Sequence, residues 1–96
     1  MSTLAPTRQE RAGRPGDAEG DAWRVIVLND DHNTFEGVAF ALSSVLPGVS
    51  YDQGLALADR IHNTGREIVW SGHREQAELY WGQLTDFGLT MAPLES

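Results

Sequence analysis

The side chains best suited to chemistry are gathered in one short stretch that directly follows an apolar segment. The stretch consists of Asn29, Asp30, Asp31, His32 and Asn33, and another histidine, His62, stands near the end of a later predicted helix. Carboxylate and imidazole groups can ligate a metal ion, exchange protons with a substrate, or form the turns and caps at a strand-to-helix corner. On the residues alone these three interpretations stay open.

The two catalytic interpretations lack supporting motifs. A metal-dependent hydrolase would use Asp30, Asp31, His32 and His62, but their spacing is not that of a known metal signature. An acid/base enzyme would be expected to carry a nucleophile motif, a glycine-rich phosphate loop or a cofactor fingerprint, and the sequence has none of these. A structural role for the cluster is therefore favoured on physical grounds.

Composition limits the kinds of partner. The chain has 96 residues, no cysteine and a formal net charge of -7. This length suits one small domain with a shallow surface site rather than a large enclosed cavity. The negative charge disfavours nucleic acid and anionic membranes as partners. Because the sequence shows no signal peptide and no apolar run of about 20 residues, we expect a cytoplasmic protein.

The first part of the chain, Met1 to Asp21, has the composition of a disordered segment. It is rich in Gly, Pro, Ala, Arg and acidic residues, and it has no large apolar side chain after Leu4. Such a segment cannot bury enough surface to offset the entropy cost of ordering. We predict a disordered N-terminal extension over residues 1–21 and a folded core over residues 22–96.

The first two predicted elements flank the polar cluster. Trp23 to Leu28 is apolar and rich in strand formers, which predicts a buried strand. Asn33 is predicted to cap a helix, with Glu36 completing a capping box. Apolar residues then recur at helical spacing until Pro47 ends the helix.

A second helix is predicted to follow. Ser50 and Gln53 form another capping-box pattern, and Gly65 is a typical left-handed stop. The side of this helix that is predicted to be buried includes Leu55, Ala58 and Ile61. His62 lies beside these apolar residues.

The remainder of the chain predicts a strand, a helix and a last strand. Glu67 to Trp70 is the predicted strand, and Ser71 or Gly72 caps a third helix that Gly88 ends. The apolar side of that helix is predicted to comprise Ala77, Tyr80, Trp81, Leu84 and Phe87. With Leu89 to Leu94 as the last strand, the prediction is an α+β fold, β-α-α-β-α-β, with a three-stranded antiparallel sheet packed against three helices.

From Trp23 to the C-terminus the sequence resembles the ClpS family, adaptors that deliver N-degron substrates to the AAA+ proteases ClpAP or ClpCP. The matching features are the apolar strand running into Asn29-Asp30-Asp31, the helix start from Asn33 to Val38, Ile61-His62 followed by Gly65, and Ala77-Glu78. These features cover roughly three quarters of the chain. The Asn-Asp-Asp corner combined with the distant Ile-His pair is more specific than either half.

The resemblance implies a pocket for the first residue of a substrate. The α-amino group would be held by Asn29 and His62, with Asp30 assisting. An ammonium has three donors, and amide, imidazole and carboxylate groups supply acceptors for them. The hydrophobic pocket would be lined by Val27, Leu28, Asn33, Phe35, Val38, Ala58, Ile61 and Leu89. Phe35 and Ala58 both stand where the family often has methionine, so the order of preference among bulky residues is expected to differ.

The resemblance also implies the function and the partners. The chain would be a monomeric adaptor, not an enzyme, that needs no metal or cofactor. It would bind proteins with N-terminal Leu, Phe, Tyr or Trp and pass them to the N-terminal domain of a ClpA- or ClpC-type unfoldase, with the tail from Met1 to Asp21 engaging the unfoldase during delivery. The alternatives are the metal-dependent hydrolase above and a regulator that occupies the unfoldase without reading N-termini.

Overall fold

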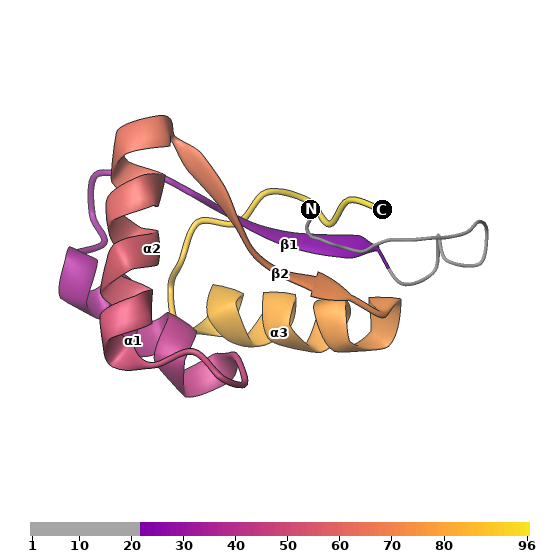
Figure 1. The fold of residues 1–96 in the computed structure, drawn as a ribbon. Coiled ribbons are helices and arrows are strands. Elements are labelled where there is room, and N and C mark those ends of the chain that lie inside the picture. The colour runs from indigo at the N-terminus through magenta and orange to yellow at the C-terminus, as the bar shows by residue number, and fades with distance from the viewer. Residues whose placement is uncertain (1–21) are drawn as a thin grey trace.

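The computed structural model describes residues 22–96, which form an α+β fold with three helices and a two-stranded antiparallel sheet. In chain order the elements are β1 (Trp23–Leu28), α1 (Phe35–Val45), α2 (Tyr51–Thr64), β2 (Arg66–Gly72) and α3 (Arg74–Asp86) (Figure 1). The predicted disordered extension, Met1 to Asp21, lies outside the described residues. None of the helices within residues 22–96 is long and apolar enough to cross a membrane.

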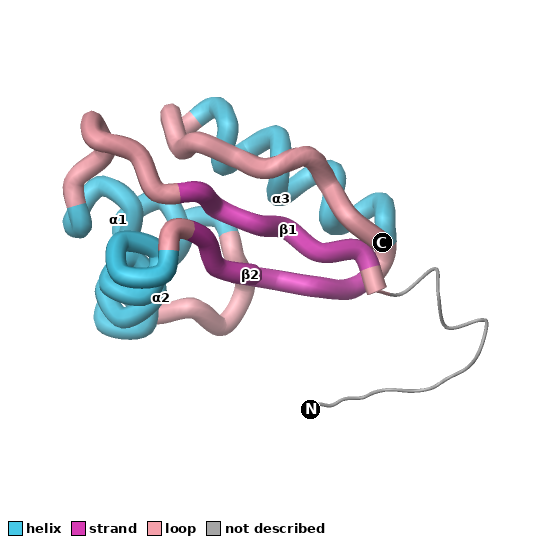
Figure 2. Tube along the Cα trace, turned by 90° about the horizontal axis from the view of Figure 1, so that it is seen from above, coloured by secondary structure: helices cyan, strands magenta, loops and turns pink. Residues whose placement is uncertain are grey.

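β1 is the central element of the fold. It pairs antiparallel with β2, with a shift of register between Val25 and Ile26. The C-terminal segment runs along the other edge of β1 (Figure 2). α3 lies across one face of the sheet, and α1 and α2 pack at the end where β1 finishes (Figure 1). Because Val25, Ile26 and Val27 are at most 1% exposed, the predicted buried strand is confirmed.

The predicted third strand, Leu89 to Leu94, is not continuous. This segment forms one isolated antiparallel bridge with β1, between Met91 and Val27, and a second bridge joins Glu95, just beyond it, to Arg24. Two further backbone hydrogen bonds join Leu28 to Thr90 and Ala92 to Ile26. Pro93 has no N–H group and cannot donate to the ladder, so regular pairing is interrupted there. The sheet therefore has two strands with an irregularly paired segment beside them, and the prediction of three strands is wrong in this respect.

The ends of α2 follow the sequence prediction. The Gln53 N–H donates to Ser50 Oγ at 3.1 Å, and the Ser50 N–H donates to Gln53 Oε1 at 2.8 Å, which completes the capping box. At the other end Gly65 adopts the left-handed conformation with φ of 91°. The predicted cap of α3 is wrong, because β2 continues to Gly72 and His73 occupies the N-cap position.

The helices pack closely around a core that includes the buried residues of β1. α1 and α2 approach each other at Gly54, where an added Cβ atom would lie 2.8 Å from the carbonyl oxygen of Ala39. Ala77 and Leu84 of α3 are completely buried, as predicted. Phe87 was predicted on the same buried side, but its exposed fraction is 45%, since it follows the last residue of α3 just before the chain turns at Gly88.

Candidate functional site

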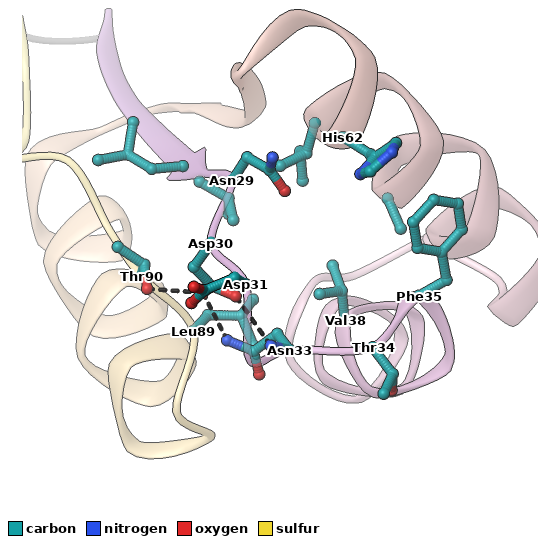
Figure 3. Close-up of a pocket in the computed structure, with 14 residues that line it drawn as sticks. Asn29, Asp30, Asp31, Asn33, Thr34, Phe35, Val38, His62, Leu89 and Thr90 are labelled. Atoms are coloured by element: carbon teal, nitrogen blue, oxygen red, sulfur yellow. Dashed lines mark hydrogen bonds between the residues drawn. The ribbon is translucent and has the colours of Figure 1, made fainter.

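A cavity of about 200 Å³ opens where the end of β1, the start of α1, the second half of α2 and the C-terminal segment meet (Figure 3). All the residues predicted for the amino-group site and for the hydrophobic pocket lie around it. The lining residues are Val27, Leu28, Asn29, Asp30, Asp31, Asn33, Thr34, Phe35, Val38, Ala58, Ile61, His62, Leu89 and Thr90. The polar cluster and the distant histidine, which are separate in sequence, thus share one cavity.

Asp30 organises the corner between β1 and α1. Its Oδ1 accepts from the backbone N–H groups of His32 at 3.1 Å and Asn33 at 2.8 Å. Its Oδ2 accepts from Asn33 Nδ2 and from Thr90 Oγ1, both at 2.7 Å (Figure 3). Burial alone would raise the pKa of this carboxyl, but the four hydrogen bonds outweigh burial and hold the pKa well below its usual range. Asp30 is therefore ionised, and its four acceptor positions are occupied.

The predicted capping of α1 is shifted by one residue. Thr34, not Asn33, is the N-cap, and its Oγ1 accepts from the Gly37 N–H at 2.9 Å. Asn33 instead uses its side-chain amide to donate to Asp30 and, at 3.0 Å, to the carbonyl oxygen of Gly88. Asn33 therefore ties the corner to the turn after α3, a role that local capping preferences cannot indicate.

Asn29 and His62 are brought to the cavity from different elements. The Asn29 N–H donates at 2.9 Å to the carbonyl oxygen of Gly65, the C-cap of α2, which fastens the end of β1 to the end of α2. Both side chains are exposed at the rim, and the amide oxygen of Asn29 points into the opening (Figure 3). An amide oxygen and a neutral imidazole nitrogen both accept hydrogen bonds, so this part of the rim suits a ligand rich in donors.

The interior of the cavity is apolar. Its buried lining residues are Val27, Val38, Ala58, Ile61 and Leu89, each at most 8% exposed. Phe35 closes one side of the mouth, with 39% of its surface exposed and its ring edge-on to the ring of His62. The site therefore combines a polar rim with an apolar interior that is open to solvent.

Thr90, Asp31 and Thr34 line the cavity but were not predicted as site residues. Thr90 is 60 positions from Asp30 in the sequence, and only the course of the C-terminal segment beside β1 brings its hydroxyl to that carboxylate. No local signal identifies Thr90. Thr34 could have been found, because threonine is a preferred N-cap residue.

The ligand set of the alternative metal-dependent hydrolase is not assembled. The four acceptor positions of Asp30 are taken, the Asp31 side chain is fully exposed, and His62 lies across the opening from both (Figure 3). Within residues 22–96 no group of three or more His, Cys, Asp or Glu side chains is placed to hold a metal ion. The geometry thus gives the hydrolase no support.

Known proteins share both the sequence and the fold. The family model "ATP-dependent Clp protease adaptor protein ClpS" matches residues 18–92. The ClpS adapter of a Nostoc species is 45% identical over 96 residues, covering 100% of this chain and 99% of that protein. The ClpS adapter of Thermosynechococcus vestitus is 52% identical over 73 residues, covering 76% and 78%. Agrobacterium tumefaciens ClpS2, solved bound to L-phenylalaninamide, has a TM-score of 0.71 at 28% identity and covers 79% of this chain and 99% of that one.

A small α+β domain with acceptors on the rim of an apolar surface pocket is a binding module. The family model and the relatives indicate the same family. The chain belongs to the ClpS family of ATP-dependent Clp protease adaptor proteins. The resemblance inferred from the sequence is thereby confirmed. The family is one of non-catalytic adaptors, so the prediction that the chain is not an enzyme is confirmed as well.

Proposed function

We propose that this protein binds the exposed N-terminal residue of a substrate protein when that residue is bulky and hydrophobic, and that it delivers the substrate to an ATP-dependent Clp protease. The supporting observation is the pairing of hydrogen-bond acceptors on the rim with an apolar cavity directly below them. L-phenylalaninamide, the ligand of the Agrobacterium tumefaciens structure, has a free amino group and an aromatic side chain, and so matches both parts of the site.

The α-amino group is held by Asn29 and His62. Each offers one acceptor from the rim, and each charge-assisted hydrogen bond contributes about 1.5 to 3 kcal/mol. Asp30 has no acceptor position left for the ammonium, so it acts through its negative charge and by fixing the corner that follows Asn29. An acetylated terminus lacks the charge and keeps only one of the three N–H donors, and it is therefore bound much more weakly.

The side chain of the first residue occupies the cavity. A volume of about 200 Å³ exceeds the roughly 150 Å³ apolar cavity that accommodates benzene in an engineered protein, so a phenyl ring fits. Burying a large apolar side chain contributes about 1.5 to 3 kcal/mol. The first residues that the cavity accepts are Leu, Phe, Tyr and Trp. The small methyl side chain of Ala58 leaves room in the cavity for the aromatic rings of Phe, Tyr and Trp.

The partner is the N-terminal domain of a ClpA- or ClpC-type unfoldase, and the adaptor acts as a monomer. Residues 1–21, which by the family resemblance engage the unfoldase, take part in delivery. On this proposal, capture of the N-terminus and transfer to the unfoldase are separable functions.

A degradation assay with purified Clp protease tests this proposal. We expect the full chain to accelerate degradation of a reporter that begins with Phe and to leave a matched reporter beginning with Glu unaffected. A variant lacking residues 1–21 should bind the Phe peptide as well as the full chain does but deliver the reporter more slowly. If both reporters respond alike, the protein is a regulator that occupies the unfoldase without reading N-termini.

A further inference from the structure

A second hollow lies where the C-terminal ends of α1 and α3 come together. Its volume is about 430 Å³, and its lining consists of Ser44, Val45, Gln83, Asp86 and Phe87. It shares no residue with the cavity that contains Asn29 and His62. α3 ends beside α1, so helix ends rather than a helix face form this surface (Figure 1).

Phe87, which lines the hollow, contacts a second exposed aromatic ring, that of Phe40, which lies outside the lining. Phe87 is 45% exposed and Phe40 is 59% exposed, and their ring centroids are 5.9 Å apart at an interplanar angle of 69°. The face of an aromatic ring carries partial negative charge and attracts Lys and Arg side chains. The pair therefore offers both apolar contact area and a weak attraction for cations.

The charges at the hollow are all negative. The C-terminal end of a helix carries about half a negative charge, and neither α1 nor α3 has a basic residue in its last turn to offset it. Asp86 adds a full negative charge in the last turn of α3. At the end of α1 the carbonyl group of Ser43 would normally accept from the residue four positions on, but that residue is Pro47, which has no N–H.

No cation of the described chain neutralises this surface. Among residues 22–96 there are four arginines, none of which lines the hollow, and all of them form ion pairs with glutamates elsewhere. The pairs are Arg24 with Glu95, Arg60 with Glu67, Arg66 with Glu95 and Arg74 with Glu78. The other three arginines of the sequence, Arg8, Arg11 and Arg14, lie outside the described residues, and none of them is next to a bulky apolar residue in the sequence. A segment that supplies a cation together with a bulky apolar side chain is therefore expected from another molecule.

We propose that this hollow is a docking surface for a partner-protein segment that carries Arg or Lys next to a bulky apolar side chain. The cation lies against Asp86 and the two helix ends, and the apolar side chain packs on Phe40 and Phe87. A second copy of this chain is a poor occupant, because a symmetric contact would place two Asp86 carboxylates and four helix C-termini together. The volume lies within the roughly 300 to 1,000 Å³ range of ligand pockets.

The test is an NMR titration of the full chain with two blocked tripeptides, acetyl-Arg-Leu-Arg-amide and acetyl-Glu-Leu-Glu-amide. Acetylation removes the α-amino group, so neither probe carries the terminal ammonium that Asn29 and His62 are proposed to hold. We expect the Arg peptide to give saturable shifts at the amides of Ser44, Gln83 and Phe87, and the Glu peptide to give none. Shifts confined to the other cavity, equal shifts with both peptides, or no saturable shifts would overturn the proposal.

Variants separate specific docking from general charge attraction. We expect Asp86→Asn and Phe87→Ala each to weaken binding of the Arg peptide by roughly two- to fivefold. Asp59→Asn removes the same charge from an exposed position on α2 and should leave binding unchanged. Well-dispersed spectra of the variants verify their fold. Equal losses in Asp86→Asn and Asp59→Asn, or concentration-dependent dimerisation that perturbs the same amides without peptide, would contradict docking of a partner segment.

Discussion

The ring of Phe35 stands edge-on to the ring of His62, with centroids 5.3 Å apart and an interplanar angle of 61°. Phe35 is the first residue of α1 and His62 lies in the last turn of α2, so the contact joins the two helices at the mouth of the cavity. Edge-to-face pairs of this kind contribute about 0.5 to 1.5 kcal/mol. Phe35 thus helps to hold the imidazole at the rim while it also narrows the entrance to the apolar interior.

Substituting Phe35 with alanine should weaken the binding of a peptide that begins with Phe by roughly three- to tenfold, because the ring contact with His62 and part of the cavity wall are lost. Fluorescence anisotropy measures this change. Phe40→Ala is the matched control, since Phe40 lies on the same helix, is 59% exposed and does not line the cavity. Equal affinities for Phe35→Ala and the unaltered protein would show that Phe35 is not part of the binding site.

The Asp30 corner should make stability depend on pH in the acid range. The hydrogen bonds hold the pKa of the folded carboxyl below its usual value of 3.8. The ionised group therefore stabilises the fold fully at pH values above about 3.8, and this contribution is lost as the pH falls toward the lower pKa of the folded state. We expect Asp30→Asn to lower the free energy of unfolding by at least about 2 kcal/mol at neutral pH.

Urea unfolding at several pH values measures this contribution. The difference between Asp30→Asn and the unaltered protein should shrink as the pH is lowered through the acid range. Asp31→Asn is the control, because the Asp31 side chain is fully exposed. Its free energy of unfolding should differ from that of the unaltered protein by no more than about 0.5 kcal/mol. A difference that is independent of pH, or an equal loss in Asp31→Asn, would refute the role assigned to the Asp30 carboxylate.

Two glycines in helices should respond to alanine with opposite signs. In Gly54→Ala the new Cβ atom would lie 2.8 Å from the carbonyl oxygen of Ala39, which forces α1 and α2 apart. We expect the free energy of unfolding to fall by about 1 to 3 kcal/mol. At Gly82 on α3 no neighbouring atom lies within 4 Å of the position that a Cβ would take. Gly82→Ala should therefore raise the free energy of unfolding by about 0.5 to 1 kcal/mol.

Chemical denaturation measures the change in the free energy of unfolding for both glycine variants. Because Val38 of α1 and Ala58 of α2 line the cavity, Gly54→Ala should also weaken peptide binding, and Gly82→Ala should not. The same sign of stability change in both variants would contradict the close approach of α1 and α2.

Features encoded by neighbouring residues could be predicted from the sequence. The capping box of Ser50 and Gln53 and the left-handed Gly65 depend only on residues a few positions apart, and both are as predicted. The resemblance named the cavity residues, because the corner after β1 and the Ile61-His62 pair are recognisable short motifs.

Features that depend on contacts distant in sequence could not be predicted in this way. Thr34 caps α1 in place of Asn33, whose side-chain amide donates to Asp30 and to Gly88 instead, and Gly88 is distant in sequence. Thr90 reaches Asp30 for a similar reason. Phe87 has the helical spacing of a buried residue, but α3 ends immediately before it and leaves the ring exposed.

The binding of one fluorescent peptide that begins with Phe, compared with the same peptide after N-terminal acetylation, tests the central claim most directly. We expect the free peptide to bind with roughly micromolar affinity and the acetylated peptide to bind at least tenfold more weakly. His62→Ala should remove one acceptor from the rim and reduce the affinity for the free peptide alone. Equal affinities for the free and acetylated peptides would contradict recognition of the α-amino group by Asn29 and His62.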